Sequence, residues 1–155
     1  MNYWLLKTEP DEYSLEHLRS EPSGQARWDG IRNYQARNLL RDAVAAGDQV
    51  LIYHSQCRQV GVVGQAEVVR GGYPDPAQFD PDSHYYDAKA SADAPRWYCI
   101  DIRFVAALPR TVTLAEIKRE PQLDDMVLRR QGRLSVQPVT RAQWQHILSM
   151  AKRGQ

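Results

Sequence analysis

The stretch WDGIRNYQARN, residues 28–38, determines how the rest of this sequence is interpreted. Trp28 and Tyr34 flank an Asp-Gly pair, which is typical of a tight turn. Arg32 and Asn33 lie between the two aromatic residues, and the sequence that follows has the apolar spacing of an amphipathic helix. Because asparagine is a preferred N-cap residue, we expect Asn33 to begin this helix. A turn, two aromatic rings, a guanidinium group and an amide are thus combined in one short segment.

Short apolar runs separated by turn signals surround this stretch on both sides. Runs with the length or alternation of strands lie at residues 2–8, 48–55, 61–69, 96–108 and 133–139. Helices are expected to begin after Ser14, to span 34–45, to follow the capping boxes Thr113–Glu116 and Thr140–Gln143, and to form short turns within 123–131. Residues 21–27 and 71–95 are expected to be loops, and a loop as long as the second is usually functional or mobile.

The order of these elements indicates the fold class. Strands and helices do not alternate regularly, which argues against a doubly wound parallel sheet. We expect an α+β fold in which about five or six mostly antiparallel strands form a small barrel with peripheral helices. The length of 155 residues suits one hydrophobic core, and no linker divides the chain, so a single domain over 1–155 is expected.

Composition and charge exclude several classes of protein. The net charge of +1 argues against wrapping long duplex DNA, but not against binding a single nucleotide. Two cysteines without a Cys-x-x-Cys pattern and four scattered histidines argue against a zinc site, so no metal or cofactor is expected. No segment reaches the roughly 20 apolar residues of a membrane helix. Charged residues also interrupt the N-terminal sequence too early for a signal peptide, so a cytoplasmic protein is expected.

Enzyme signatures are missing from the sequence. It contains no Walker A loop, no G-x-G-x-x-G, no G-x-S-x-G, no H-E-x-x-H and no zinc-deaminase pattern. His54 and Ser55 are adjacent on a predicted strand, so their side chains point to opposite faces and do not form a direct catalytic dyad. Hydrogen bonding is therefore favoured over catalysis for this pair, and no catalytic residue is expected.

An ordered set of motifs carries a family resemblance. WLLKTEPDEYS (4–14), WDGIRNYQARN (28–38), VLIYHS (50–55), VGVVGQAEVV (60–69), YPDP (73–76), YYDAK (85–89), PRWYCIDI (95–102) and RLSVQPV (133–139) occur in this order. Together they resemble the EVE domain family, from about Asn2 to Ile147. The family often has serine at the position of Thr8 and asparagine at the position of Gln56, so the hydroxyl and the amide are both kept here.

The resemblance implies a PUA-like pseudo-barrel with a pocket for a modified nucleobase of DNA or RNA. A flipped base needs a flat apolar slot and a few directed polar groups, and the 28–38 stretch contains both. We therefore expect a non-enzymatic, monomeric reader whose partner is nucleic acid or a small nucleotide-like ligand. Vertebrate members carry a basic N-terminal extension, whereas this sequence starts directly at the domain, so a bacterial member is expected.

The expected ligand-binding residues come from several parts of the sequence. Trp28 is assigned to a slot wall and Arg32 to a phosphate contact. Tyr34 is assigned to a second wall or a hydroxyl donor, and Asn33 either to the ligand or to its helix cap. The other candidates are Lys7 and Glu9 at the pocket rim or as a structural ion pair, Tyr13 and Ser14 at its mouth, His54 and Ser55 at its floor, and Trp97 beside the long loop.

Further residues and two further functions stay open at this point. The loop tyrosines Tyr85 and Tyr86 either close over the ligand or anchor the loop, and Trp144 is expected in the core. Arg129, Arg130 and Arg133 form either a phosphate-contacting face or a solvated surface. The alternatives to a reader are an enzyme that processes a nucleotide or nucleic acid, and a module that binds a small molecule or a protein.

Overall fold

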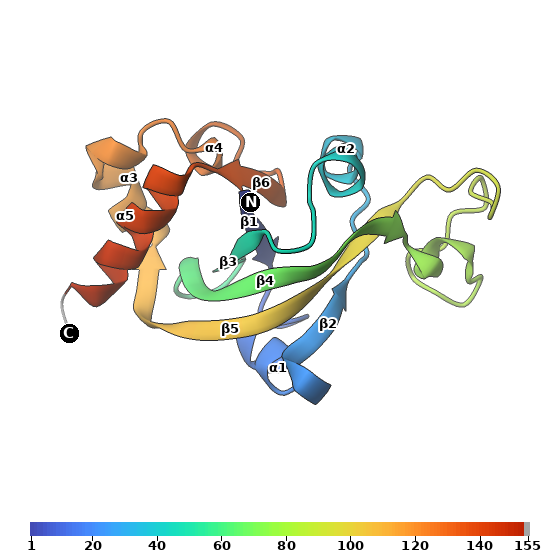
Figure 1. Ribbon diagram of the computed structural model, residues 1–155, viewed down its shortest axis with the longest axis horizontal. Helices are drawn as coiled ribbons and strands as arrows, with labels where there is room; N and C mark the ends of the chain where they lie inside the picture. Colours follow the sequence, from blue (N-terminus) through green and yellow to red (C-terminus); the bar gives the residue numbers. More distant parts are fainter. Residues whose placement is uncertain (154–155) are drawn as a thin grey trace.

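One mixed β-sheet lies at the centre of the computed structural model, which describes residues 1–153 (Figure 1). The strands are β1 (Tyr3–Thr8), β2 (Gln25–Trp28), β3 (Gln49–His54), β4 (Gly61–Pro74), β5 (Tyr98–Thr113) and β6 (Val136–Val139). Their order is β2-β5-β4-β3-β1-β6; β1 and β3 pair in parallel, and the other neighbours pair antiparallel. The predicted α+β fold with mostly antiparallel strands is confirmed. Residues 154 and 155 of the expected domain lie outside the described residues.

The helices surround this sheet and begin where the sequence predicts. They are α1 (Leu15–Arg19), α2 (Tyr34–Asp42), α3 (Leu114–Arg119), α4 (Val127–Arg130) and α5 (Arg141–Lys152). Ser14, Thr113 and Thr140 form capping boxes at α1, α3 and α5. Asn33 Oδ1 accepts a hydrogen bond from the Ala36 N–H at 2.9 Å and caps α2. Within residues 1–153, no helix has the length and apolar character needed to cross a membrane.

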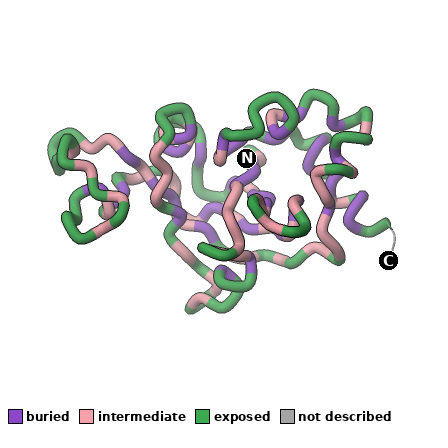
Figure 2. The backbone as a smooth tube through the Cα atoms, turned by 180° about the vertical axis from the view of Figure 1, so that it is seen from behind, coloured by how far each residue is buried: buried purple, intermediate pink, exposed green. Residues whose placement is uncertain are grey.

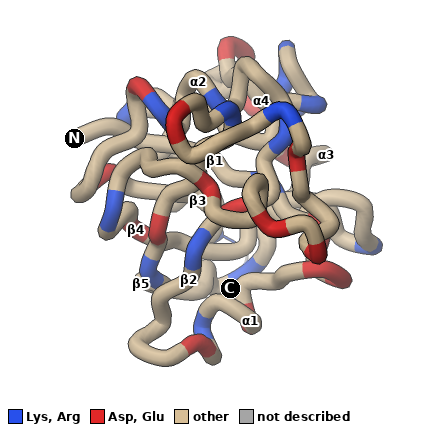
Figure 3. Tube along the Cα trace, turned by 90° about the vertical axis from the view of Figure 1, so that its right-hand side faces the viewer, with Lys and Arg blue, Asp and Glu red and all other residues tan. Residues whose placement is uncertain are grey.

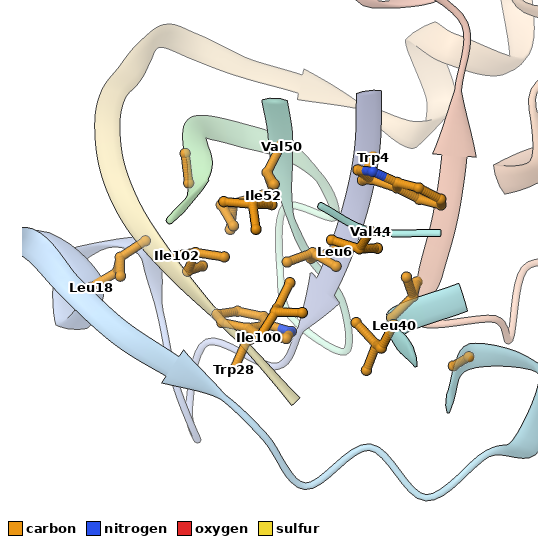
Figure 4. Packing of buried hydrophobic residues seen from close by; sticks show 14 of the residues in the cluster. Trp4, Leu6, Leu18, Trp28, Leu40, Val44, Val50, Ile52, Ile100 and Ile102 are labelled. Atoms are coloured by element: carbon orange, nitrogen blue, oxygen red, sulfur yellow. The ribbon is translucent and has the colours of Figure 1, made fainter. Parts of the chain in front are cut away.

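Alternating side chains of β1 and β3 build an apolar layer on each face of the sheet. The first cluster includes Trp4, Leu6, Leu18, Trp28, Leu40, Val44, Val50, Ile52, Ile100 and Ile102, which are labelled in Figure 4, and also Leu15. The second cluster includes Leu5, Leu51, Tyr53, Val112, Ile117, Leu123, Met126, Trp144 and Ile147. Helices α1 and α2 contribute to the first cluster, and α3 and α5 contribute to the second. Because β1 and β3 are buried on both faces, their sequences are nearly continuous apolar runs.

Four strands differ from their expected extents by more than one residue at an end. β6 was expected over 133–139 but spans only Val136–Val139, because these are the residues that pair with β1. Residues 25–27 of β2 lie in the 21–27 segment that was expected to be a loop. The strand was not predicted because its alternating exposed residues lack the apolar pattern of a strand. β4 and β5 extend beyond their expected ends, to Pro74 and Thr113, and pair along their length with several register shifts. Such irregularities increase local bend and twist. Gly64 lies at one shift, where a Cβ would meet Leu15 Cδ2 at 2.6 Å, so α1 packs closely on β4.

Residues 75–97 form a lobe that projects beyond the sheet, on the right in Figure 1 and on the left in Figure 2. Most residues of this lobe are at least partly exposed, but Asp75 and Gln78 are fully buried. Gln78 Nε2 donates to the carbonyl oxygens of Asp75 and Trp97, and Gln78 Oε1 accepts from the N–H groups of Arg96 and Trp97, at 2.8–2.9 Å. A fully hydrogen-bonded buried amide therefore closes the base of the lobe.

Candidate functional site

A cleft of about 870 Å³, called the main cleft below, opens where β1, β2 and β3 end. Its walls also include the segment before β6 and one tyrosine of the lobe. The lining residues are Lys7, Thr8, Glu9, Glu12, Tyr13, Arg27, Trp28, Asp29, Gly30, Ile31, Arg32, Ser55, Gln56, Tyr85, Gly132, Arg133 and Ser135. Chain segments distant in sequence thus meet at one end of the sheet.

Trp28 and Tyr13 provide the aromatic surface of the main cleft. Trp28 is only 7 % exposed, and the Tyr13 ring meets it edge to face, with 5.9 Å between the ring centroids. The Tyr13 hydroxyl donates a hydrogen bond to Glu21 Oε1 at 2.9 Å. Burial, followed by this hydrogen bond, raises the pKa of Tyr13 above its ordinary value. The phenol therefore stays neutral at physiological pH, and its ring is held against Trp28.

Lys7, Arg27 and Arg133 bring positive charge to the main cleft. Lys7 Nζ donates a hydrogen bond to the Gly132 carbonyl oxygen and lies 5.1 Å from the centroid of the Tyr53 ring. Partial burial lowers the pKa of Lys7. Lys7 thereby joins the end of β1 to the segment before β6, and it is also one of the residues that line the cleft.

Glu9, Glu12 and Asp29 bring negative charge to the same cleft. Asp29 is exposed as a residue, yet desolvation of its carboxyl, followed by the nearby Asp75 carboxylate, raises the pKa of Asp29. Carboxylate oxygens accept hydrogen bonds from amino groups, including the exocyclic amine of cytosine. Figure 3 shows that basic and acidic residues are also interspersed along the chain as a whole. The main cleft therefore offers acceptors and cations beside an aromatic surface.

An ion pair holds the turn after β2 against the lobe. Arg32 Nη1 donates to Asp75 Oδ2 at 3.0 Å, and Arg32 Nη2 donates to the Tyr85 carbonyl oxygen at 2.8 Å. The buried Asp75 carboxylate also accepts hydrogen bonds from the Gly30 and Ala77 N–H groups. Gly30 has a φ of +76°, and a Cβ there would lie 2.7 Å from Tyr85 Cζ, so glycine is required for this close contact. The turn, the lobe and Tyr85 form one connected unit.

Tyr34 and Trp97 stack on each other outside the main cleft. Their ring centroids are 4.8 Å apart, and the planes differ by 28°. The Arg37 guanidinium lies 4.8 Å from the centroid of Tyr34, and the Arg32 guanidinium lies 5.4 Å from that of Trp97. Trp97 Nε1 donates a hydrogen bond to Asp87 Oδ2 at 2.8 Å. These rings fasten the lobe to the start of α2.

The structure brings only some of the predicted ligand-binding residues together. Those that line the main cleft are Lys7, Glu9, Tyr13, Trp28, Arg32 and Ser55, whereas Ser14, Asn33, Tyr34, His54 and Trp97 lie outside its lining. Ser14 and Asn33 use their side-chain oxygens as helix caps. His54 Nε2 accepts a hydrogen bond from the Leu15 N–H at 3.1 Å, and burial lowers the pKa of His54. Ligand contact by any of the predicted residues stays a prediction.

Part of the lining was outside the predicted set because it comes from distant segments. Gly132 and Ser135 reach the main cleft because β6 pairs with β1, a pairing that no local sequence pattern signals. Asp29 adjoins Trp28 in the same turn, so the turn itself was a signal for it. Tyr85, one of the two loop tyrosines considered for closing over a ligand, lines the cleft.

Fold and cleft together define an α+β domain of the PUA-like type with a polar cleft built around a tryptophan. Within the described residues, 1–153, no group of three or more His, Cys, Asp or Glu side chains is arranged to hold a metal ion. The family model of the EVE domain matches residues 2–150. The chain belongs to the EVE domain family.

Known relatives share both the sequence and the fold. Mouse thymocyte nuclear protein 1 is 40 % identical over 166 residues, which cover 96 % of this chain and 73 % of that protein. A crystal structure of a Pseudomonas syringae protein is 47 % identical with a TM-score of 0.89, covering 96 % of this chain and 99 % of that one. A crystal structure of human THYN1 protein in complex with 5-methylcytosine-containing DNA is 35 % identical with a TM-score of 0.94, covering 100 % of both chains.

A more distant likeness extends to the YTH domain of Zygosaccharomyces rouxii MRB1 protein, solved in complex with N6-methyladenosine RNA. That domain is 15 % identical with a TM-score of 0.52, covering 99 % of this chain and 88 % of that one. At this identity the likeness concerns the fold alone.

Proposed function

We propose that this protein is a non-enzymatic reader that binds one modified nucleobase of DNA or RNA in the main cleft. The observation that carries the proposal is the mixed lining, in which Trp28 and Tyr13 lie beside carboxylates and cations. An aromatic surface stabilises a stacked base by about 1–3 kcal/mol. Lys7, Arg27 and Arg133 supply positive charge for the phosphates that flank the base. The net charge of +1 fits a short contact with nucleic acid rather than a long electrostatic interface.

The human relative supports a methylated base as the ligand, because its structure is a complex with 5-methylcytosine-containing DNA. 5-Methylcytosine has an exocyclic amine that donates hydrogen bonds and a methyl group that is apolar. In the proposed mode, the amine donates to the carboxylate of Asp29 or Glu9, and the methyl group contacts the aromatic surface. We therefore propose 5-methylcytosine as the first base to test, in both DNA and RNA.

Binding without turnover is part of the proposal. The neutral His54 ring already accepts a hydrogen bond from a backbone N–H, so the ring nitrogen Nε2 is engaged rather than free to serve Ser55 as a base. The reader is proposed to act as a single-domain monomer over residues 1–155 in the bacterial cytoplasm. Time-dependent conversion of 5-methyl-dCMP, detected by chromatography and abolished by Asp29→Asn, would contradict the non-enzymatic assignment.

The experiment is a fluorescence-anisotropy titration of labelled single-stranded DNA and RNA pentanucleotides whose central base is cytosine or 5-methylcytosine. The proposal predicts saturable binding with a clear preference for the methylated base. Trp28→Leu removes the aromatic surface and should weaken binding roughly ten-fold or more. The matched control Trp144→Leu changes a tryptophan of equal exposure in the second cluster and should leave the affinity unchanged.

Two results would contradict the proposal. Equal affinity for methylated and unmethylated strands would show that the protein does not recognise the base modification. Lack of binding to every strand by a folded protein, checked by circular dichroism, would favour a small molecule or a protein as the ligand of the cleft.

A further inference from the structure

A second, smaller cleft of about 370 Å³ lies beside the main cleft. The two clefts share Gly30, Arg32 and Tyr85 in their linings, so they are neighbours across these residues. The second cleft is otherwise formed by lobe residues, among them Tyr86 and Trp97. Tyr85 therefore contributes to the walls of two adjacent concave sites.

Tyr85 is held firmly in this shared position. Its carbonyl oxygen accepts a hydrogen bond from Arg32 Nη2, and the Arg32 guanidinium lies 5.2 Å from the centroid of its ring. The ring also lies so close to Gly30 that an added Cβ would be 2.7 Å from Cζ. Arg32 is fixed in turn by the buried Asp75 carboxylate. The contacts make Tyr85 a rigid partition rather than a loose loop side chain.

The second cleft contains an aromatic side chain, Tyr86, that remains exposed to solvent in the folded protein. Tyr86 is 45 % exposed, which is high for a large aromatic residue. Trp97 is oriented by its hydrogen bond to Asp87 and by stacking on Tyr34, so its ring is fixed beside the cleft. The Arg96 side chain, 37 % exposed, lies 3.9 Å from Asp87 at the same end of the lobe and supplies a cation. An exposed tyrosine ring next to a cation suits a stacked nucleotide.

We propose that the second cleft binds the nucleotide adjacent to the modified base on the same strand, with Tyr85 separating the two bases. This inference rests on the proposed function of the main cleft. Consecutive bases of a strand stack on each other, so a base that enters the main cleft must lose its stacking contact with the adjacent base. The tyrosine partition keeps the two bases apart, and Tyr86 gives the neighbour a new stacking partner.

The test compares two probes on the same protein: 5-methyl-dCMP, which fills only the main cleft, and a single-stranded DNA pentanucleotide with central 5-methylcytosine, which fills both. Wild-type protein should bind the pentanucleotide more tightly than the mononucleotide. Tyr86→Ala should weaken pentanucleotide binding roughly ten-fold and leave mononucleotide binding unchanged. The matched control Phe79→Ala alters another exposed aromatic of the lobe, 36 % exposed and outside both linings, and should change neither affinity.

The outcomes separate this inference from the function on which it rests. If the pentanucleotide binds to Tyr86→Ala as tightly as to wild type, the second cleft is not a nucleotide subsite, even though the reader function stands. If Tyr86→Ala weakens both probes equally, Tyr86 belongs to the main site and the two-site assignment is wrong. If neither probe binds to wild-type protein, the proposed function fails and the inference fails with it.

Discussion

Trp28 and Trp144 are equally buried, yet they lie in regions of different character. Each is 7 % exposed. Trp144 belongs to the second cluster, which is formed by apolar residues, and its ring tilts against Tyr3 with 5.1 Å between the ring centroids. Trp28 belongs to the first cluster on one side and lines the main cleft on the other, beside charged residues of both signs. Burial therefore does not distinguish a core tryptophan from a site tryptophan, whereas the polarity of the neighbouring wall does.

We expect the greatest change in stability from a substitution in the second cluster, which contains Trp144. Trp144→Ala leaves a cavity in the second cluster and should lower the free energy of unfolding by about 3–5 kcal/mol. Urea unfolding followed by circular dichroism measures this loss. Binding of the 5-methylcytosine pentanucleotide, measured below the unfolding transition, should stay at the wild-type affinity. A matching loss of affinity would contradict this expectation, because it would show that the second cluster is coupled to the main cleft.

The ion pair between Arg32 and Asp75 is expected to make the next largest contribution to stability. Asp75→Asn removes the negative partner of Arg32 inside the protein and should destabilise it by about 3 kcal/mol, because the arginine loses its countercharge in a partly buried position. Thermal unfolding measures the change. Asp124→Asn, at an ion pair on the surface with Arg129, is the control and should leave the melting temperature nearly unchanged. Similar shifts for both variants would show that the Arg32–Asp75 pair does not hold the lobe.

Replacing Gly30 is expected to have a smaller effect on stability and also to weaken ligand binding. Gly30→Ala introduces a Cβ at a φ of +76° and against the Tyr85 ring, so the ring must move. The cost in stability should be about 1–3 kcal/mol. Gly47→Ala also changes a glycine of positive φ, 92°, but a Cβ there meets no atom of the described residues within 4 Å. Only Gly30→Ala should also weaken binding of the pentanucleotide, and equal binding losses would contradict a role for Tyr85.

The smallest expected effect concerns pH. Burial lowers the pKa of His54 below its ordinary value of 6.5, and Nε2 must be unprotonated to accept the Leu15 N–H. The unfolded chain therefore binds the proton at a higher pH than the folded one, so stability falls as pH drops through 6.5. Urea unfolding between pH 8 and pH 5 should show this decline in wild-type protein and a shallower decline in His54→Gln. His84→Gln should keep the wild-type slope; an identical slope in all three proteins would exclude His54.

Local patterns predicted the capped helices and the residues at which they begin. Ser14, Asn33, Thr113 and Thr140 cap helices as expected, because capping depends on residues within one turn of chain. β2 was missed because a strand formed by pairing with β5 need not have an apolar pattern of its own. The extents of β4 and β5 were underestimated for the same reason, since their outer residues are ordered by each other.

The site was harder to predict, because it depends on contacts between distant segments. Lys7 and Trp28 were named from their motifs, and both line the cleft. Tyr34 and Trp97 have the same aromatic character, but they stack on each other and fasten the lobe. Gly132 joins the lining through Lys7, 125 residues away in sequence. Residue type thus predicts which side chains can bind a base, whereas the long-range pairing of strands decides which of them meet.

Binding in the main cleft can be tested by following the indole N–H signals of the four tryptophans by nuclear magnetic resonance while the pentanucleotide with central 5-methylcytosine is added. Single tryptophan variants assign each signal. If the ligand binds in the main cleft, the Trp28 signal should shift in a saturable way, while the signal of the equally buried Trp144 stays in place. Saturable binding that shifts Trp144 and leaves Trp28 unchanged would contradict it, because the ligand would then lie away from the main cleft.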